Sequence, residues 1–289
     1  MPDGLNSKFI VGTKFEIANV VPVLILVCGC ARETFPDVCR VQDRRLTEAS
    51  GIAVDRNNPS QYWTHNDSGS KLALFQFDSD CRVMRRVPVN VAGRSDWEDV
   101  ATARLDNQDF VLVADIGNNS KWRTELKILA FRLPVQENAR PLFTVRFRYP
   151  DFTRNAECLL VFEKAKKFQI VPKHQISPVP IFEGDLRETE QPQVLKKVGS
   201  VQIGGAVPLL QMITGGSTSP SGHVVVLRNY VSAYVFRPRS GQPWFKTDPI
   251  MLPLNGETTG EGIGVSPDGS RVVSIHEGPS PLLTQITLP

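Results

Sequence analysis

Short hydrophobic strands separated by polar turn residues recur along most of the chain. Five of these strands open on a Ser, Thr or Glu, at spacings of 47 to 59 residues: Ser50-Gly-Ile-Ala-Val, Glu98-Asp-Val-Ala, Glu157-Cys-Leu-Leu-Val, Thr214-Gly-Gly-Ser and Glu261-Gly-Ile-Gly-Val. The strand after each opening ends in a polar segment, at residues 65–69, 114–119, 171–174, 227–230 and 275–278. A repeat of about 50 residues built from short strands is typical of propeller blades. Because the first strand of a blade starts where the second ends, all ten segments are predicted to meet at one end of the ring, the mouth.

The strand pattern predicts an all-β fold, a five-bladed β-propeller that forms a single domain over residues 38–289. The fifth repeat ends one strand short, whereas residues 38–46 provide a spare strand before the first opening. Pairing this spare strand with the C-terminal strand closes the ring and removes an exposed edge. Six blades are the alternative, if residues 183–209 contain another sheet.

The N-terminal segment has the pattern of an export signal. Lys8 and Lys14 precede an apolar run over residues 20–27, which is about half the ~20 residues that a spanning helix needs. The run ends at Cys28-Gly-Cys30 and resembles a bacterial lipoprotein signal. That resemblance implies a signal peptide over residues 1–29, lipidation at Cys30, a tether over residues 30–37, and an exported location in the cell envelope, the periplasm or outside the cell. The alternatives are an uncleaved anchor and a soluble protein with a buried first strand.

Charge and cysteine content narrow the classes of partner and compartment. A net charge of +3 without a basic run argues against nucleic acid and against an anionic membrane surface, so contact with a membrane is expected only through the lipid anchor. We expect a monomer. In an oxidising compartment Cys39 and Cys81 are the most plausible disulfide pair, which leaves Cys158 as a buried free thiol. No Cys or His spacing suggests zinc.

The five opening residues predict a calcium site on the propeller axis. Three carboxylates and two hydroxyls would converge there, and like charges ~4 Å apart repel by about 4 kcal/mol at an effective dielectric constant of 20. A hard divalent cation with oxygen ligands relieves this repulsion. The alternative is that these side chains only cap the inner strands and bind buried water. The predicted metal ligands, called the axial ring below, are Ser50, Glu98, Glu157, Thr214 and Glu261.

The polar segments that end the second strands predict a ligand site above this ring. Lys173 and Arg228 are expected to hold a small anionic ligand, with His65 and Asn118 nearby. Asp67, Asp115 and Glu277 are the candidates for a general base. The alternative is a self-neutralising network in which the two cations only pair with neighbouring carboxylates.

Five further residues near these segments have less specific expectations. Asp96 and Asp99 flank Glu98 and are interpreted as supporting or turn residues. The tryptophans at these strands and loops are interpreted as packing residues: Trp63, Trp97 and Trp122.

The sequence resembles two groups of known proteins. The segments Trp63-Thr-His-Asn-Asp-Ser-Gly69, Asp96-Trp-Glu-Asp-Val-Ala101 and Ala114-Asp-Ile-Gly-Asn-Asn119 are similar to those of secreted bacterial propeller proteins of unassigned activity, a group labelled esterase-like or phytase-like. This likeness spans residues ~46 to 285 and implies a propeller. The axial ring also resembles that of the calcium-activated nucleotidases (apyrases), with Thr214 in place of a Ser; that likeness implies an axial calcium and a basic rim at Lys173 and Arg228.

These observations lead to three functional hypotheses. The first is an exported calcium-binding propeller whose mouth holds a small anionic ligand and which, as an enzyme, hydrolyses a phosphoester or phosphoanhydride. The second is a non-catalytic envelope module with structural calcium that binds a peptide, glycan or protein partner. The third is a metal-dependent lactonase or esterase.

Overall fold

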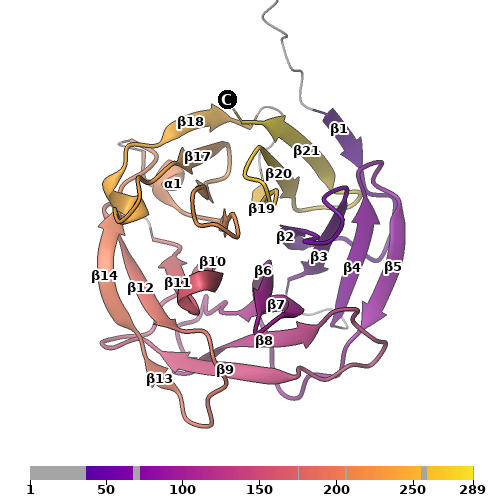
Figure 1. The fold of residues 1–289 in the computed structure, drawn as a ribbon, viewed down its shortest axis with the longest axis horizontal. Helices are drawn as coiled ribbons and strands as arrows, with labels where there is room; N and C mark the ends of the chain where they lie inside the picture. Colours follow the sequence, from indigo (N-terminus) through magenta and orange to yellow (C-terminus); the bar gives the residue numbers. More distant parts are fainter. Residues whose placement is uncertain (1–36, 68–71, 175, 206, 255–258, 289) are drawn as a thin grey trace, which may run out of the picture. The chain divides into compact units, whose positions relative to one another are not determined.

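Five small sheets form a ring around a central axis (Figure 1). The computed structural model describes residues 37–67, 72–174, 176–205, 207–254 and 259–288. The five-bladed β-propeller predicted from the sequence is therefore confirmed. The predicted signal peptide, the lipidation site Cys30 and nearly all of the predicted tether lie outside the described residues.

Blades one to three follow one another along the chain and share the same up-and-down order. Blade one contains β2 (Ala49–Val54), β3 (Gln61–Asn66), β4 (Ala73–Asp78) and β5 (Val83–Pro88). Blade two contains β6 (Trp97–Leu105), β7 (Gln108–Asp115), β8 (Leu126–Arg132), β9 (Phe143–Arg148) and β13 (Gln193–Val194). Blade three contains β10 (Ala156–Phe162), β11 (Lys167–Pro172), β12 (Val179–Asp185) and β14 (Lys196–Val201).

Blades four and five complete the ring. Blade four contains β15 (Gly215–Thr218), β16 (Val225–Arg228), β17 (Ser232–Phe236) and β18 (Ile250–Pro253). Blade five contains β19 (Gly260–Val265), β20 (Arg271–His276), β21 (Leu282–Thr287) and β1 (Asp37–Arg40). The helices of the described residues are short: η1 (Glu163–Ala165), α1 (Pro208–Gln211) and η2 (Trp244–Lys246). None of them is long and apolar enough to cross a membrane.

The ring closes between the two ends of the described chain, as the sequence predicts. Strand β1 pairs antiparallel with β21, with Cys39 opposite Leu283 (Figure 1). A disulfide joins Cys39 to Cys81, which follows β4 in blade one, across a Cα–Cα distance of 6.0 Å. The predicted disulfide is confirmed, and it links the outer strand of blade five to blade one. Cys158 is buried and free, also as predicted.

The hydrophobic core is divided among the five interfaces between neighbouring blades. Strand β2 is buried along its whole length, and Ile52 packs in the cluster that joins blade one to blade five. Phe147 of blade two contacts Phe168 of blade three, with ring centroids 5.1 Å apart. Each sheet thus buries both faces against its neighbours, so no single blade can form its core alone.

The six-bladed alternative is wrong. Residues 183–209 contain the end of β12, the strands β13 and β14, and the start of α1. Strand β13 pairs parallel with β9 at the edge of blade two, and β14 is the outer strand of blade three. The described part of this segment therefore extends existing blades, and its length reflects the parallel return to blade two.

Candidate functional site

The strand register brings the predicted polar segments together at one end of the ring. In each blade the first residues of the inner strand pair with the last residues of the second strand: Ala49 with Asn66, Trp97 with Asp115, Ala156 with Pro172, Gly215 with Arg228, and Gly260 with His276. The inner strands approach closely here, since a Cβ on Gly262 would lie 2.8 Å from the carbonyl carbon of Gly51. Side chains at these positions are consequently crowded around the axis.

Three carboxylates form an acidic cluster at the mouth. Ligand oxygens of Asp67, Asp96 and Glu98 all lie within 4.8 Å of one another. Among the described residues this is the group of acidic, His or Cys side chains close enough to share one metal ion. Asp67 follows β3, whereas Asp96 and Glu98 stand at the start of β6, so two neighbouring blades form the cluster. Of these three residues, the axial ring predicted from the sequence contained Glu98.

The surroundings of the Glu98 side chain disfavour its ionised form. Its Oε1 is buried and accepts no hydrogen bond from the described residues. Burial, followed by repulsion from Glu157, Asp67 and Asp96, raises the pKa of Glu98 well above its ordinary value. Gly117 makes this crowding possible, because a Cβ at that position would lie 2.2 Å from Glu98 Oε1. The space over Glu98 is therefore kept free of side-chain carbon.

Two further acidic residues, Glu157 and Glu261, lie beside this cluster together with the cation Lys173. Lys173 Nζ lies 2.6 Å from Glu157 Oε1, and both side chains are largely buried. Burial raises the pKa of Glu157 despite the opposing attraction of Lys173. Burial and the Glu157 charge raise the pKa of Glu261 to about 9. Burial alone would lower the pKa of Lys173, but Glu157 and Glu261 outweigh it and the pKa is raised.

The two hydroxyls of the axial ring connect neighbouring blades. Ser50 Oγ donates to the Glu98 carbonyl at 2.9 Å, and Thr214 Oγ1 donates to the Gly260 carbonyl at 2.8 Å. Both residues are buried. Each hydroxyl therefore uses its proton within the protein, and toward any further partner its oxygen can act only as an acceptor.

Arg228 does not form the predicted basic rim. Its side chain is completely buried, and Nη1 donates to Ser274 Oγ at 2.6 Å and to the Gly262 carbonyl at 3.0 Å. Nε donates to the Asn229 carbonyl at 3.0 Å. The expectation that Arg228 holds an anionic ligand at the mouth is corrected accordingly. Its guanidinium instead binds blade four to blade five through main-chain carbonyls.

Asp115 and Asn118 organise the loop between β7 and β8. Asp115 is completely buried, and its Oδ1 accepts from Arg123 Nη2 at 2.7 Å and from the Asp96 main-chain N–H at 2.9 Å. Asn118 is also buried, and its amide bonds to both the N–H and the carbonyl of Arg123. Asp115 is therefore a positioning residue and not an accessible general base. Asn118 shapes the loop and does not present its amide to a ligand.

His65 and Glu277 occupy different environments. His65 is completely buried, its Nδ1 lies 3.0 Å from the Asn66 carbonyl, and its ring meets Trp97 edge-on. Burial lowers the pKa of His65 to about 4, so the ring is neutral at pH 7. The predicted role of His65 in ligand binding is thus not supported by its position. Glu277 is partly exposed at the end of β20 and lies outside the acidic cluster.

Sequence reasoning underestimated Asp96 and Trp122. Asp96 belongs to the acidic cluster, and its place two residues before Glu98, at the entry to β6, was the available signal. Trp122 is 59% exposed, so its interpretation as a packing residue is wrong. Trp122 stands in a polar loop outside any strand pattern, and this position was the available sign that its side chain is exposed. Trp63 and Trp97 are buried as expected.

The acidic cluster has the chemistry of a site for a hard cation. Its donors are carboxylate oxygens, which suit Ca²⁺ or Mg²⁺ better than zinc or copper. The unpartnered Oε1 of Glu98 and the space left by Gly117 both fit an ion at this position. Such an ion would neutralise the carboxylates and polarise an anionic ligand bound to it.

Comparisons with known proteins found only a distant structural likeness. No protein-family model matches the chain, and no curated protein matches it. Among solved structures it is similar to the β-propeller domain of Cps50 (Swd1) from Myceliophteria thermophila, with 9% sequence identity and a TM-score of 0.47. That match covers 84% of this chain and 98% of the other.

Proposed function

We propose that this propeller binds a divalent cation, Ca²⁺ in the first instance, at Asp67, Asp96 and Glu98, and uses it to hold a small anionic ligand at the mouth. The buried, unpartnered Oε1 of Glu98 within this cluster is the observation that carries the proposal. An uncompensated carboxylate oxygen in a buried position is costly unless a proton or a cation neutralises it. The proposed ligand set shifts the predicted calcium site from the axis toward the interface of blades one and two.

The position of Arg228 favours ligand binding over phosphoester hydrolysis. The hydrolase hypothesis needs two cations to grip a phosphate, but Arg228 is buried between blades four and five. Lys173, the other predicted cation, already neutralises Glu157. An anion at the mouth would therefore bind to the proposed metal ion, and not to the pair of basic side chains predicted from the sequence. A cation-dependent binding module agrees best with this arrangement.

The disulfide supports the proposal that the protein works outside the cytosol. Disulfides persist in oxidising compartments and are rare in reducing ones. The Cys39–Cys81 bond joins the N-terminal strand to blade one and so secures the seam of the ring. We propose an exported protein, in agreement with the signal-like residues that precede this strand.

Thermal unfolding in calcium and in chelator tests the cation site. At a calcium concentration about 1,000 times Kd, binding adds about 4 kcal/mol to the free energy of unfolding. For a domain of this size the unfolding midpoint should rise by roughly 10 °C. Glu98→Gln should lose this response, whereas Glu190→Gln, on an exposed loop, should retain it. A wild-type midpoint that is equal in calcium and chelator would refute the site.

A further inference from the structure

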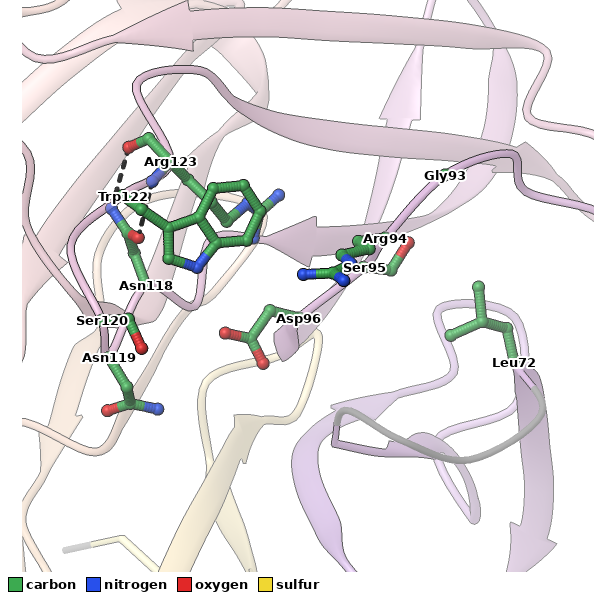
Figure 2. A pocket seen from close by; sticks show the side chains of 10 residues that line it. All are labelled: Leu72, Gly93, Arg94, Ser95, Asp96, Asn118, Asn119, Ser120, Trp122 and Arg123. Atoms are coloured by element: carbon green, nitrogen blue, oxygen red, sulfur yellow. Dashed lines mark hydrogen bonds between the residues drawn. The ribbon is translucent and has the colours of Figure 1, made fainter.

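A pocket of about 530 Å³ opens beside the acidic cluster (Figure 2). Its lining includes Arg94, Asp96, Asn119, Ser120 and Trp122. Figure 2 shows the Trp122 indole and the Arg94 side chain on either side of Asp96. Because Asp96 also belongs to the acidic cluster, a ligand in this pocket would lie next to the proposed cation. The volume is within the range of small-molecule sites, ~300 to 1,000 Å³.

Trp122 presents a flat apolar surface from an ordered loop. Its side chain is 59% exposed, although it is the largest apolar group in the pocket. The next residue, Arg123, fixes the loop because its guanidinium bonds the Gly117 carbonyl at 2.7 Å and the buried Asp115 carboxylate at 2.7 Å. An exposed indole on a loop held in this way loses little conformational freedom on binding. This arrangement is unlike that of a tryptophan that packs in a core.

Arg94 supplies the pocket with a cation that is available to a ligand. Its side chain is exposed and makes no ion pair with the described residues, and its guanidinium lies 6.0 Å from the centroid of the Trp122 ring. A guanidinium can bind a carboxylate through two parallel hydrogen bonds. The pocket therefore combines one ring platform with one anion-binding group.

The remaining lining residues are suited to hydroxyl groups. Asn119 is exposed, and because its Oδ1 already accepts from Asn155 Nδ2 at 3.0 Å, its amide N–H groups are the part it offers to a ligand. The hydroxyl of Ser120, also exposed, can donate one hydrogen bond and accept others. Ser95 Oγ is buried and has no hydrogen-bond partner among the described residues. An apolar peptide side chain would leave these polar groups unpaired, which is unfavourable. A ligand rich in hydroxyls would pair with them.

We infer that this pocket binds a residue of an acidic saccharide, a uronic acid. Its pyranose ring would lie on the Trp122 indole, its hydroxyls would bond Asn119 and Ser120, and its carboxylate would pair with Arg94. The inference rests on the proposed function, because the uronate is the small anionic ligand that the cation at the acidic cluster helps to hold. It extends that function by naming the class of ligand and the residues that select it.

Isothermal titration of the full chain with trigalacturonic acid, and with galactotriose as the neutral counterpart, tests this inference. The acidic trisaccharide should bind in calcium, and the neutral one should bind at least about tenfold more weakly. Trp122→Ala should weaken binding of the acidic ligand about tenfold or more, and Trp122→Phe should restore most of it. Arg94→Gln should bring the acidic ligand close to the neutral one, whereas the exposed Arg140→Gln should change neither.

Each result separates this inference from the proposed cation site. If calcium raises the unfolding midpoint but trigalacturonic acid does not bind, the saccharide inference fails and the cation site stands. If trigalacturonic acid binds equally in calcium and chelator, with the dependence on Trp122 and Arg94, the pocket stands without the cation. If an acidic peptide such as tetraglutamate binds more tightly than the saccharide through the same two residues, the inferred ligand class is wrong.

Discussion

Lys173 Nζ lies 2.6 Å from Glu157 Oε1 and 5.1 Å from the centroid of the Tyr230 ring, so one carboxylate of the axial ring is already paired with a cation of the protein. This pair divides the predicted ring into two parts. Glu157 and Glu261 share Lys173, while Glu98 joins Asp67 and Asp96. The second group is therefore the proposed cation site.

Replacing Lys173 should raise the calcium affinity of the protein and lower its stability in the absence of calcium. Lys173→Met removes a positive charge near the proposed cation, so we expect calcium affinity to rise about tenfold, or about 1.4 kcal/mol. In chelator the variant should be less stable by about 3 to 5 kcal/mol, because Glu157 loses its buried partner. Titration calorimetry and thermal unfolding measure the two effects. The exposed Lys196→Met on β14 is the control, and an unchanged calcium affinity in Lys173→Met would contradict the prediction.

A methyl group at Gly117 should block the acidic cluster. Its Cβ would lie 2.2 Å from Glu98 Oε1 and 2.4 Å from Asp96 Oδ2. Gly117→Ala should therefore abolish the calcium response and lower stability by about 1 to 3 kcal/mol. Gly241→Ala is the control, because its Cβ meets no atom within 4 Å and its φ of +77° alone costs about 1 to 2 kcal/mol. A calcium response that survives in Gly117→Ala would argue against this location.

Arg228 should matter for stability and not for binding at the mouth. Arg228→Met leaves the Gly262 and Asn229 carbonyls without their buried donor, so we expect a loss of about 3 kcal/mol in the free energy of unfolding. Calcium affinity, measured on the folded variant below its unfolding midpoint, should remain that of the wild type. A large loss of calcium or anion binding without a loss of stability would restore the rim role predicted from the sequence.

The Cys39–Cys81 disulfide should stabilise the closed ring. It closes a loop of 42 residues along the sequence, for which chain entropy predicts a contribution of about 4 kcal/mol. The double variant Cys39→Ser, Cys81→Ser should unfold at a lower denaturant concentration than the wild type. The reducing agent should destabilise the wild type and leave the double variant unaffected. Equal midpoints for wild type and double variant would contradict this role.

The turn at Asp268 should give a small acid-dependent contribution to stability. Asp268 accepts hydrogen bonds from Ser266 Oγ and Ser270 Oγ, which lower its pKa from 3.8 to about 2. Because the folded pKa is lower than the unfolded one, the stabilisation is present above about pH 4 and is lost as the pH falls through 2. Asp268→Asn should remove this pH dependence, at a cost of no more than about 1 kcal/mol at pH 7 because the side chain is exposed.

The corresponding turn of blade four provides the control for this measurement. Ser221 stands at the position of Asp268 there, and its Oγ lies 3.2 Å from Ser219 Oγ. Ser221→Ala should therefore leave the slope of stability against pH between 4 and 2 unchanged. An equal slope in wild type and Asp268→Asn would show that the carboxylate does not contribute.

The blade repeat could be predicted from the sequence, because each blade packs in the same way and therefore has the same local pattern of apolar and turn residues. The opening at Ser50 and the opening at Glu261 both start a strand that is buried on two faces, so apolar runs bounded by turns recur at blade spacing. The role of the spare N-terminal strand could likewise be predicted, because pairing it with the C-terminal strand completes the last blade. Its position on an outer strand also made its cysteine a disulfide candidate. The sequence did not predict the direction in which buried side chains point. Arg228 is next to the mouth in sequence register, yet its guanidinium turns inward to carbonyls of another blade.

The sequence by itself determined the propeller class, the closure of the ring and the set of polar residues at one end, because strand periodicity and turn residues are local properties. It favoured five blades, and the structure excluded six. The tertiary structure alone decided which of those residues meet. Asp67 approaches Glu98 from a different blade, Lys173 neutralises Glu157, and Gly117 leaves the space above the acidic cluster. These relations depend on distances across blade interfaces, and such distances are set by packing that no single repeat encodes.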